Sequence, residues 1–564
     1  MKFHTFFFAA LSPLGLLHPC AAGDDAERLA RAKQFYEKQL WAEAAREAQG
    51  PADQSAELDY YEGMALSHLE RWEEARAAFS NGVNKWPTDA RFPTERAGAE
   101  YKLNDYRAAK ADLRRTLRLE PRDSYVLEFL GTIYLLEGNT EAALKYWNRV
   151  QKPKLAAVAL VPAAKTSKTL LDRAVTFAPP GELLRDSFLQ MDALLDNLGV
   201  FPRRRDELVP AQDDTYQATL KLSERSGWGA TTFDGLLSLF SGVPYETVFP
   251  SWYGIRGEAV NFGSLARWDD QKRRIAANVE FPLFHQPAKK LRLFFDARNE
   301  NWNLIGSFAA PGPAITDLNV KRFAGGAEFH QVESGWWDWS TGVEVISRQF
   351  ANAPTNLQTA AAPFFTDSRS LDAWLSAHRW LTRIPERRFT LDGTGEVRGG
   401  RGYATGLGAY GSLQGGLAAR WLPKATGDDL EFITRLRGAD TFGDVPLDML
   451  YELGVERDND LWLRGHDATA GGRKGAAPLG RRYVLCNSEL NKTAYNGGFF
   501  HVQVGPFFDT GAVADPTGLF GSQKWLFDTG VQARIRVLGS VSVVLSYGRD
   551  LRSGKGLFFA TSTR

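Results

Sequence analysis

From about residue 226 to the end, the chain is made of short runs in which apolar and polar side chains alternate, and this pattern constrains the fold most. Residues 274–281, 291–296 and 541–548 alternate in this way. In residues 531–537, Val531, Ala533, Ile535 and Val537 alternate with Gln532, Arg534 and Arg536. A period of two predicts β-strands with one apolar face. Such strands suit a transmembrane barrel with lipid outside and water inside. They also suit a soluble sandwich, whose apolar faces turn inward.

The N-terminus favours the barrel. Lys2 precedes a short apolar run, and the small-residue stretch Cys20-Ala21-Ala22 follows it. This is the pattern of a secretory signal peptide, assigned to residues 1–22. Lipidation of Cys20 is the alternative, which Pro19 disfavours. No later stretch reaches about 18 apolar residues, so any membrane span is expected from strands. Residues 226–564 therefore predict an outer-membrane β-barrel of about 16 antiparallel strands.

Composition and motifs exclude several functions. The 68 basic and 67 acidic residues leave a net charge of +1, so we expect no nucleic-acid partner. Cys486 is the only cysteine after the leader in the sequence, which excludes an intrachain disulfide in the mature protein. No HExxH, paired CxxC or GxSxG motif stands in the right context. We therefore expect no enzyme, catalytic residue or cofactor. His466 and His501 lack a carboxylate cluster in the sequence, so no metal site is expected.

Residues 24–152 are rich in helix-forming residues and repeat with a period of 34, which resembles the tetratricopeptide repeat. Small residues recur at two positions of the repeat, where two helices must approach closely: Gly63, Ala97 and Gly131, and Ala75, Ala109 and Ala143. Pro87 and Pro121 recur where a helix must end. Three repeats cover roughly residues 56–152, after a degenerate first unit that caps the array. Such arrays bind peptides or partner proteins, and the alternative is a spacer.

Residues 153–225 predict a small α/β unit. An apolar run at 155–161 is followed by helix-forming stretches at 167–177 and 182–198, and then by two short strands. The order β-α-α-β-β resembles the polypeptide-transport-associated (POTRA) domain, whose helix ends in Leu-Gly-x-Phe. Gly199 and Phe201 hold the glycine and phenylalanine positions of that motif, and Glu224 ends the last strand. The resemblance implies an exposed strand edge that receives client segments by β-augmentation.

Residues 437–491 resemble the long-loop region of the outer-membrane assembly-factor and surface-antigen superfamily. The family's hydrophobic-Arg-Gly-aromatic motif is read here as Leu463-Arg464-Gly465-His466, with histidine in the aromatic position. A Phe-x-Asp-x-Gly motif follows at residues 507–511. The resemblance implies that the loop folds back into the barrel and that Arg464 pairs with Asp509. The alternation around Asp509 independently places this residue on the polar face of its strand. Two departures are the single Gly454 before the loop and the C-terminal GLFFATSTR, where the family often ends in an aromatic residue.

The fold class expected is thus multidomain: a helical-repeat solenoid, a POTRA-like domain and a transmembrane β-barrel. The function expected is insertion of outer-membrane proteins or protein translocation. Its partners would be outer-membrane lipid, unfolded client proteins and periplasmic accessory proteins bound by the repeats. The N-terminal domains would lie in the periplasm. The alternative is a polysaccharide-export or general porin linked to a repeat scaffold, and a weaker one is a surface receptor or adhesin. Residues 153–225 discriminate between the first two, because a porin would follow the helical array directly.

Overall fold

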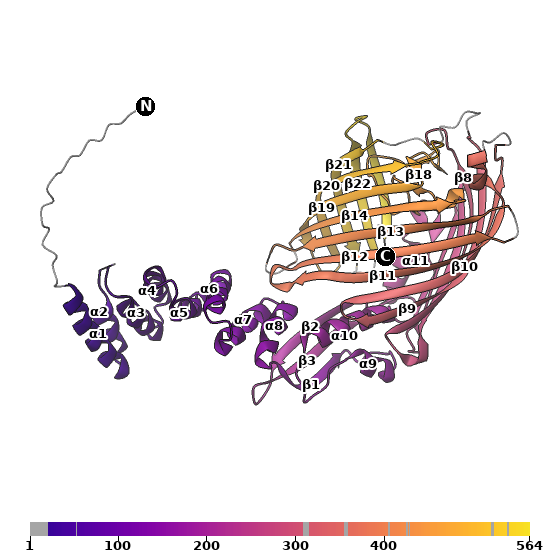
Figure 1. Ribbon diagram of the computed structural model, residues 1–564. Helices are drawn as coiled ribbons and strands as arrows, with labels where there is room; N and C mark the ends of the chain where they lie inside the picture. The colour runs from indigo at the N-terminus through magenta and orange to yellow at the C-terminus, as the bar shows by residue number, and fades with distance from the viewer. Residues whose placement is uncertain are drawn as a thin grey trace, which may run out of the picture. The chain divides into compact units, whose positions relative to one another are not determined.

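The computed structural model describes residues 21–563 except 52, 308–314, 355–358, 404–405, 425–426, 428, 521–523 and 538–540. Almost all of the expected signal peptide, with Cys20, lies outside the described residues. The chain forms two compact units, Met1–Leu136 and Glu137–Arg564. Figure 1 shows the helices of the first unit and the large sheet of the second. Among the described residues, no helix has the length and apolar character needed to cross a membrane.

The first unit consists of consecutive helices that pack in pairs, with the spacing that the 34-residue repeat predicts. Its helices are α1 (Ala21–Glu37), α2 (Trp41–Ala48), α3 (Ala56–His68), α4 (Trp72–Lys85), α5 (Arg91–Lys102), α6 (Tyr106–Leu119) and α7 (Ser124–Leu136). The aromatic ring of Phe79 on α4 packs where a Cβ atom at Gly63 would stand, 2.5–2.7 Å away. Ala75, Ala97 and Ala109 are fully buried. The small residues of the repeat are therefore required by close helix contacts.

The last helix of the repeat pattern, α8 (Thr140–Trp147), belongs to the second unit, so the compact helical unit ends before residue 152. Glu141 on α8 accepts hydrogen bonds from Arg185, which begins helix α10 (Arg185–Leu198), and from Arg383 near the end of strand β11 (Ser368–Ile384), at 2.8 Å each. The side chain of Asn139 donates to the carbonyl of Pro385 in the next turn, at 2.8 Å. These contacts tie α8 to the rest of the second unit.

The α/β unit has the predicted order of elements. It comprises β1 (Lys154–Val161), α9 (Lys168–Ala174), α10 (Arg185–Leu198), β2 (Arg203–Pro210) and β3 (Thr215–Ser223). The sheet order is β1-β3-β2, with β1 parallel and β2 antiparallel to β3. Gly199 caps α10 at φ +70°, a left-handed conformation that glycine adopts without strain. Phe201 is buried behind this cap.

One end of the barrel carries this α/β unit, and Figure 1 shows α10 beside β9. Asn197 at the end of α10 donates to the carbonyl of Pro287 at 2.8 Å, in the turn between β7 and β8. Arg173 in the last turn of α9 donates to the carbonyls of Phe284 and His285 in the same turn, at 3.0 and 2.8 Å. A Cβ atom at Gly335, in the turn between β9 and β10, would stand 2.5 Å from Leu189. The α/β unit is thus fixed against two of the turns at this end.

All but two of the remaining described strands form one sheet that closes into a barrel. Its wall consists of β4 (Thr247–Val248), β5 (Ser251–Ile255), β6 (Val260–Trp268), β7 (Lys272–Pro282), β8 (Lys289–Trp302), β9 (Leu318–Ser334), β10 (Trp337–Ala351), β11 (Ser368–Ile384), β12 (Phe389–Gly402), β13 (Ala409–Trp421), β14 (Leu430–Gly443), β19 (Arg482–Asn496), β20 (Phe500–Ala514), β21 (Leu526–Val537), β22 (Val541–Asp550) and β23 (Gly556–Thr563). From β6 to β23 each strand pairs antiparallel with the next.

The described part of the sheet has 18 strands, against the expected 16. Two short loop strands, β16 (Thr469–Ala470) and β17 (Arg473–Lys474), join the sheet through β8. The first stretch of the barrel wall is also divided into two short strands, because β4 and β5 both pair with β6. The prediction of strands from residue 226 was wrong for the first 20 residues, which contain helix α11 (Thr232–Phe240). Thr231 caps this helix, and Phe233, Leu236, Leu237 and Phe240 have helical spacing.

The orientation of the strands distinguishes between the barrel and the sandwich. On β10, Val343 and Val345 are 51% and 45% exposed on the outer face, while Glu344 and Arg348 are buried on the inner face. On β11, Leu371 and Leu375 are likewise exposed outside, and Asp372 is fully buried inside. Apolar side chains therefore cover the outside of the barrel and charged ones line its lumen, which is the reverse of a soluble sandwich.

Candidate functional site

The long connection between β14 and β19, residues 444–481, folds into the lumen and touches opposite parts of the wall. It contains η6 (Leu447–Met449) and a two-stranded sheet of β15 (Tyr451–Glu452) and β18 (Leu479–Gly480). We call it the lumen loop. Its Glu456 lies 2.9 Å from Lys272 on β7, and its Asp448 lies 2.6 Å from Arg348 on β10. These two ion pairs are buried or nearly so, which places the loop inside the barrel.

The tip of the lumen loop binds the wall through Arg464. Its Nε and Nη2 atoms donate to the two carboxylate oxygens of Asp509 on β20, at 2.8 and 2.6 Å. Its Nη1 donates to Glu489 on β19 at 2.9 Å and to Gln532 on β21 at 2.8 Å. The guanidinium carbon also lies 3.8 Å from the centroid of the Phe507 ring. Arg464 is 2% exposed and Asp509 is 0% exposed. The planar guanidinium thus donates to both oxygens of a buried carboxylate, which a lysine ammonium cannot do in the same geometry.

Two glycines bring the loop backbone onto the wall. The Gly465 amide donates to Asp528 on β21 at 2.6 Å. A Cβ atom on Gly465 would stand 2.5 Å from the backbone nitrogen of Asp550. Opposite it, a Cβ atom on Gly548 of β22 would stand 1.9 Å from the carbonyl oxygen of Arg464. Neither position has room for a side chain, so both glycines are required for the contact.

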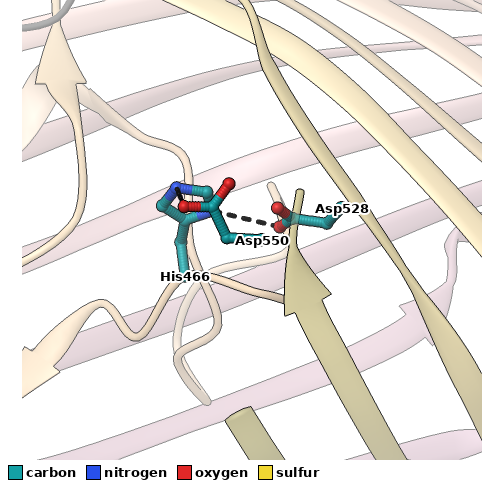
Figure 2. Close-up of side chains that lie close together, drawn as sticks. All are labelled: His466, Asp528 and Asp550. Carbon is teal, nitrogen blue, oxygen red and sulfur yellow. Dashed lines mark hydrogen bonds and ion pairs between the residues drawn. The ribbon is translucent and has the colours of Figure 1, made fainter. Parts of the chain in front are cut away.

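His466 follows directly and lies between two aspartates of the wall. Its Nδ1 is 3.0 Å from Asp528 Oδ2, and its Nε2 is 3.8 Å from Asp550 Oδ2. Figure 2 shows the imidazole and the two carboxylates directed toward one another. His501 is not part of this group. It lies near the opposite end of β20, where it is the register partner of Arg536, and its Nδ1 lies 3.3 Å from Asn496.

Sequence reasoning missed Glu489, Gln532, Asp528, Asp550 and Gly548. A signal for them exists in the alternation, because Asp528 shares the parity of Gln532 on β21, and Asp550 that of Gly548 on β22. All of these residues therefore lie on the polar face of their strands. The alternation does not say which of the many lumen-facing residues lie beneath the loop tip, and that depends on long-range strand pairing.

The rest of the lumen is polar and charged. A cavity of about 790 Å³ lies between the lumen loop and the strands β6–β13. Charged residues of both signs line it: Arg274, Arg292, Asp296, Arg298, Glu344 and Arg398. Arg274 and Arg298 both lie 2.6 Å from Asp296, and Arg274 also lies 2.7 Å from Asp458 of the loop. The loop thus occupies part of a polar lumen in which several of the charged side chains pair with one another.

The motif residues of the α/β unit contribute to its junction with the barrel. Glu224, at the end of β3, accepts a hydrogen bond from the Thr166 hydroxyl at 2.7 Å and one from the Lys165 amide at 2.5 Å. The carbonyl of Val200, between Gly199 and Phe201, accepts from the Arg225 amide at 2.7 Å. The end of α10 and the start of the link to the barrel are therefore held together.

The fold and this site define a class: a β-barrel with a loop latched inside its lumen, preceded by a β-α-α-β-β unit and a helical-repeat array. No family model and no curated protein matches the chain. Solved structures similar to it include BamA from Haemophilus ducreyi lacking POTRA domains 1–3, at 11% identity and TM-score 0.42, covering 73% of this chain and 84% of that one. CdiB from Acinetobacter baumannii has 13% identity and TM-score 0.44, covering 73% and 74%. MamA has 17% identity and TM-score 0.22, covering 22% and 75%.

Proposed function

We propose that this chain is an outer-membrane β-barrel that inserts or translocates other proteins, with its N-terminal domains in the periplasm. The observation that carries the proposal is the buried attachment of Arg464, on the lumen loop, to Asp509 on the wall. A general porin needs an open aqueous lumen. Here the loop is anchored across the lumen by buried ion pairs, so passage of a client requires the barrel or the loop to rearrange.

The position at which the lumen loop attaches to the wall supports a role in protein insertion or translocation. The loop tip binds strands β19 to β22, next to the last strand β23. The Trp462 ring of the loop also lies 5.7 Å from that of Phe559 on β23 itself. β23 precedes β4 in the strand order, so the first and last strands meet at a seam. The seam strands β4, β5 and β23 have only 2, 5 and 8 residues, against 17 in β9.

Short strands make few ladder hydrogen bonds, so the seam is the weakest line of the wall. Each backbone hydrogen bond contributes about 1 kcal/mol. Opening the seam exposes strand edges, which pair readily with another extended chain. Client strands would add to these edges, and the work would be done by strand pairing with no covalent chemistry.

The α/β unit gives the client a first binding edge. Its β-α-α-β-β order and the Gly199 and Phe201 positions support a POTRA-like role. In the described part of the unit, β2 is an edge strand that pairs with β3 alone. The backbone groups of such an edge can bind an extended client by β-augmentation, whatever its side chains. The repeats would recruit clients or periplasmic accessory proteins.

Residues 153–225 also bear on the alternative, a polysaccharide-export or general porin. In that case the helical array would lead directly to an open channel. The α/β unit stands between α8 and the barrel, and the lumen loop occupies the channel, so both features favour a protein-handling barrel.

Depletion of the protein tests the proposal. The outer-membrane and secreted proteomes would be compared before and after depletion, with the wild-type gene and an Arg464→Ala variant supplied for rescue. Loss of several barrel proteins would support insertion, and loss of one secreted protein would support export. An unchanged proteome, or full rescue by Arg464→Ala at equal abundance, would contradict the proposed function.

A further inference from the structure

Three aspartates lie side by side across the wall beneath the tip of the lumen loop. Asp509 on β20 is the register partner of Asp528 on β21, and Asp528 is the register partner of Asp550 on β22. They are 0%, 0% and 7% exposed. Like charges directly opposite on neighbouring strands destabilise a sheet, and more so when buried. A row of three therefore requires compensating positive charge.

The lumen loop provides a full positive charge at only one end of this row, at Asp509. Arg464 lies on Asp509 with two hydrogen bonds. In the part of the chain that the structure describes, His466 is the only basic side chain within ion-pair distance of Asp528 or Asp550. An imidazole carries at most one positive charge, and none when it is neutral. Two buried carboxylates thus face one weakly basic ring. Their other partners are neutral backbone amides: that of Gly465 at Asp528, and those of Arg552 and Ser553 at Asp550.

We propose that His466 and Asp550 bind a divalent transition-metal ion, of which Zn²⁺ fits best, and that Asp528 positions the imidazole and adds negative charge beside the ion. A charge of +2 balances the two carboxylates, and one imidazole with carboxylates is a ligand set that zinc accepts. The ligand atoms of the three residues all lie within 4.8 Å of one another.

The distances suit a metal better than a direct ion pair at Asp550. The gap of 3.8 Å between His466 Nε2 and Asp550 Oδ2 is too long for a hydrogen bond. A metal with bonds of about 2.0–2.2 Å to each atom spans it. On the other side, Nδ1 is 3.0 Å from Asp528 Oδ2, close enough for Asp528 to orient the ring.

Asp528 supplies an independent indication of a missing partner. Its Oδ1 atom is fully buried and has no hydrogen-bond partner among the described residues. Figure 2 shows this carboxylate pointing toward the imidazole. A buried carboxylate oxygen without a partner is costly unless a further ligand satisfies it.

Such a metal would join the loop tip to β21 and β22, beside the seam strand β23, and would lock the loop in its lumen position. This role rests on the proposed function, whereas metal binding itself does not. Metal release would leave His466 held to the wall only by its hydrogen bond to Asp528, while Arg464 still held Asp509. The loop would therefore have two attachments that can be removed separately.

The test uses full-length mature protein in detergent, stripped of metal with a chelator and dialysed. Titration calorimetry with Zn²⁺ should show one site per chain, and the melting temperature should rise with free zinc. His466→Ala and Asp550→Asn should each weaken binding at least tenfold. His501→Ala is the matched control and should bind as the wild type does, since His501 lies away from the cluster. Heat-modifiable gel mobility identifies variants that have folded.

X-ray absorption of the zinc-loaded wild type needs no variant, and it should report nitrogen and oxygen ligands. No stoichiometric binding by the wild type would overturn the site, as would unaltered binding by folded His466→Ala. Sulfur coordination would overturn it too, because it would assign the metal to the free thiol of Cys486. Intact zinc binding together with an unchanged proteome after depletion would instead count against the proposed function alone.

Discussion

Arg464 and Asp509 are 45 residues apart in the chain and form a two-pronged, fully buried ion pair inside the barrel. The same carboxylate also accepts the backbone amide of Arg464 at 3.1 Å and the side chain of Asn487 at 2.8 Å. Every hydrogen-bonding direction of Asp509 is thus used by the loop or by a neighbouring strand. The pair holds the loop in one position through a geometry that few other residues could reproduce.

Breaking this pair should be costly. Arg464→Ala leaves a buried carboxylate unpaired and should lower the free energy of unfolding by about 3–5 kcal/mol. Arg464→Lys should also destabilise, because an ammonium cannot bind both oxygens in a plane. Denaturant unfolding of the barrel in detergent measures both changes. Arg482→Lys is the control: Arg482 pairs with Asp440 at 3.3 Å, both side chains are about half exposed, and this change should cost under about 1 kcal/mol.

A charge swap tests whether the pair itself matters for function. Arg464→Asp and Asp509→Arg should each impair client handling, since each places two like charges together in a buried site. The double swap should recover part of it. Glu489 and Gln532 also bind Arg464, so recovery should be incomplete. Equal impairment in the double and single swaps would show that the contact is not the cause.

Much of this architecture can be predicted from local patterns. The repeat spacing identifies Gly63 and Ala109 because each fills a contact between helices adjacent in sequence. The alternation of β20 places Asp509 on the lumen face, since parity is a local property of a strand. Gly199 is recognisable as a helix cap for the same reason. These residues have roles set within one element or between neighbours.

The rest depends on long-range pairing. Glu489, Asp509, Gln532 and Asp550 come together only because four strands pair in one register, and one residue of slip would turn a strand's polar face outward. The position of the lumen loop inside the barrel also depends on contacts between residues that are far apart in the sequence. Helix α11 was missed for another reason: the alternation downstream was extended backward over a segment whose apolar spacing is helical.

The outer surface predicts where the protein is found. Exposed apolar residues such as Val343 and Leu371 face outward on neighbouring strands, so the barrel needs lipid or detergent around it. The mature protein should fractionate with the outer membrane. It should also migrate faster on gels when unheated, because a closed barrel resists unfolding in detergent. Recovery in the soluble periplasmic fraction, or mobility independent of heating, would contradict the barrel.

The helical repeats predict a packing effect at Ala109. This residue on α6 is fully buried, so a larger side chain has no space. Ala109→Leu should overpack the α5–α6 pair and cost about 1–3 kcal/mol. Thermal unfolding of the first unit, followed by circular dichroism, measures the change. Arg107→Leu, at an exposed position on the same helix, serves as the comparison, and equal melting of both variants would refute the packing.

Glu141 predicts how α8 is held on the second unit. Its carboxylate binds Arg383 of the barrel and Arg185 of the α/β unit, so Glu141→Ala leaves two guanidiniums facing each other. Hydrogen exchange in α8 should become faster while exchange in the barrel strands stays unchanged. Glu207→Ala, which removes a surface pair with Lys221, should leave α8 exchange unaltered. Unchanged exchange in α8 after Glu141→Ala would show that the other contacts suffice.

Glu100 predicts a pH dependence of the helical unit. Burial, together with the nearby Asp112 carboxylate, raises the pKa of Glu100 to about 7. An unfolded glutamate has a pKa of about 4.3. Because the folded pKa is the higher one, the folded state binds the extra proton: the stabilisation is complete below about pH 4 and is lost as the pH rises to about 7. Glu100→Gln, which stays neutral, should therefore raise the melting temperature of the first unit at pH 8 and have little effect at pH 4. Glu43→Gln, an exposed change, should alter neither. Thermal unfolding of residues 21–136 at both pH values measures the difference, and an equal effect of Glu100→Gln at the two pH values would mean that Glu100 does not titrate in this range.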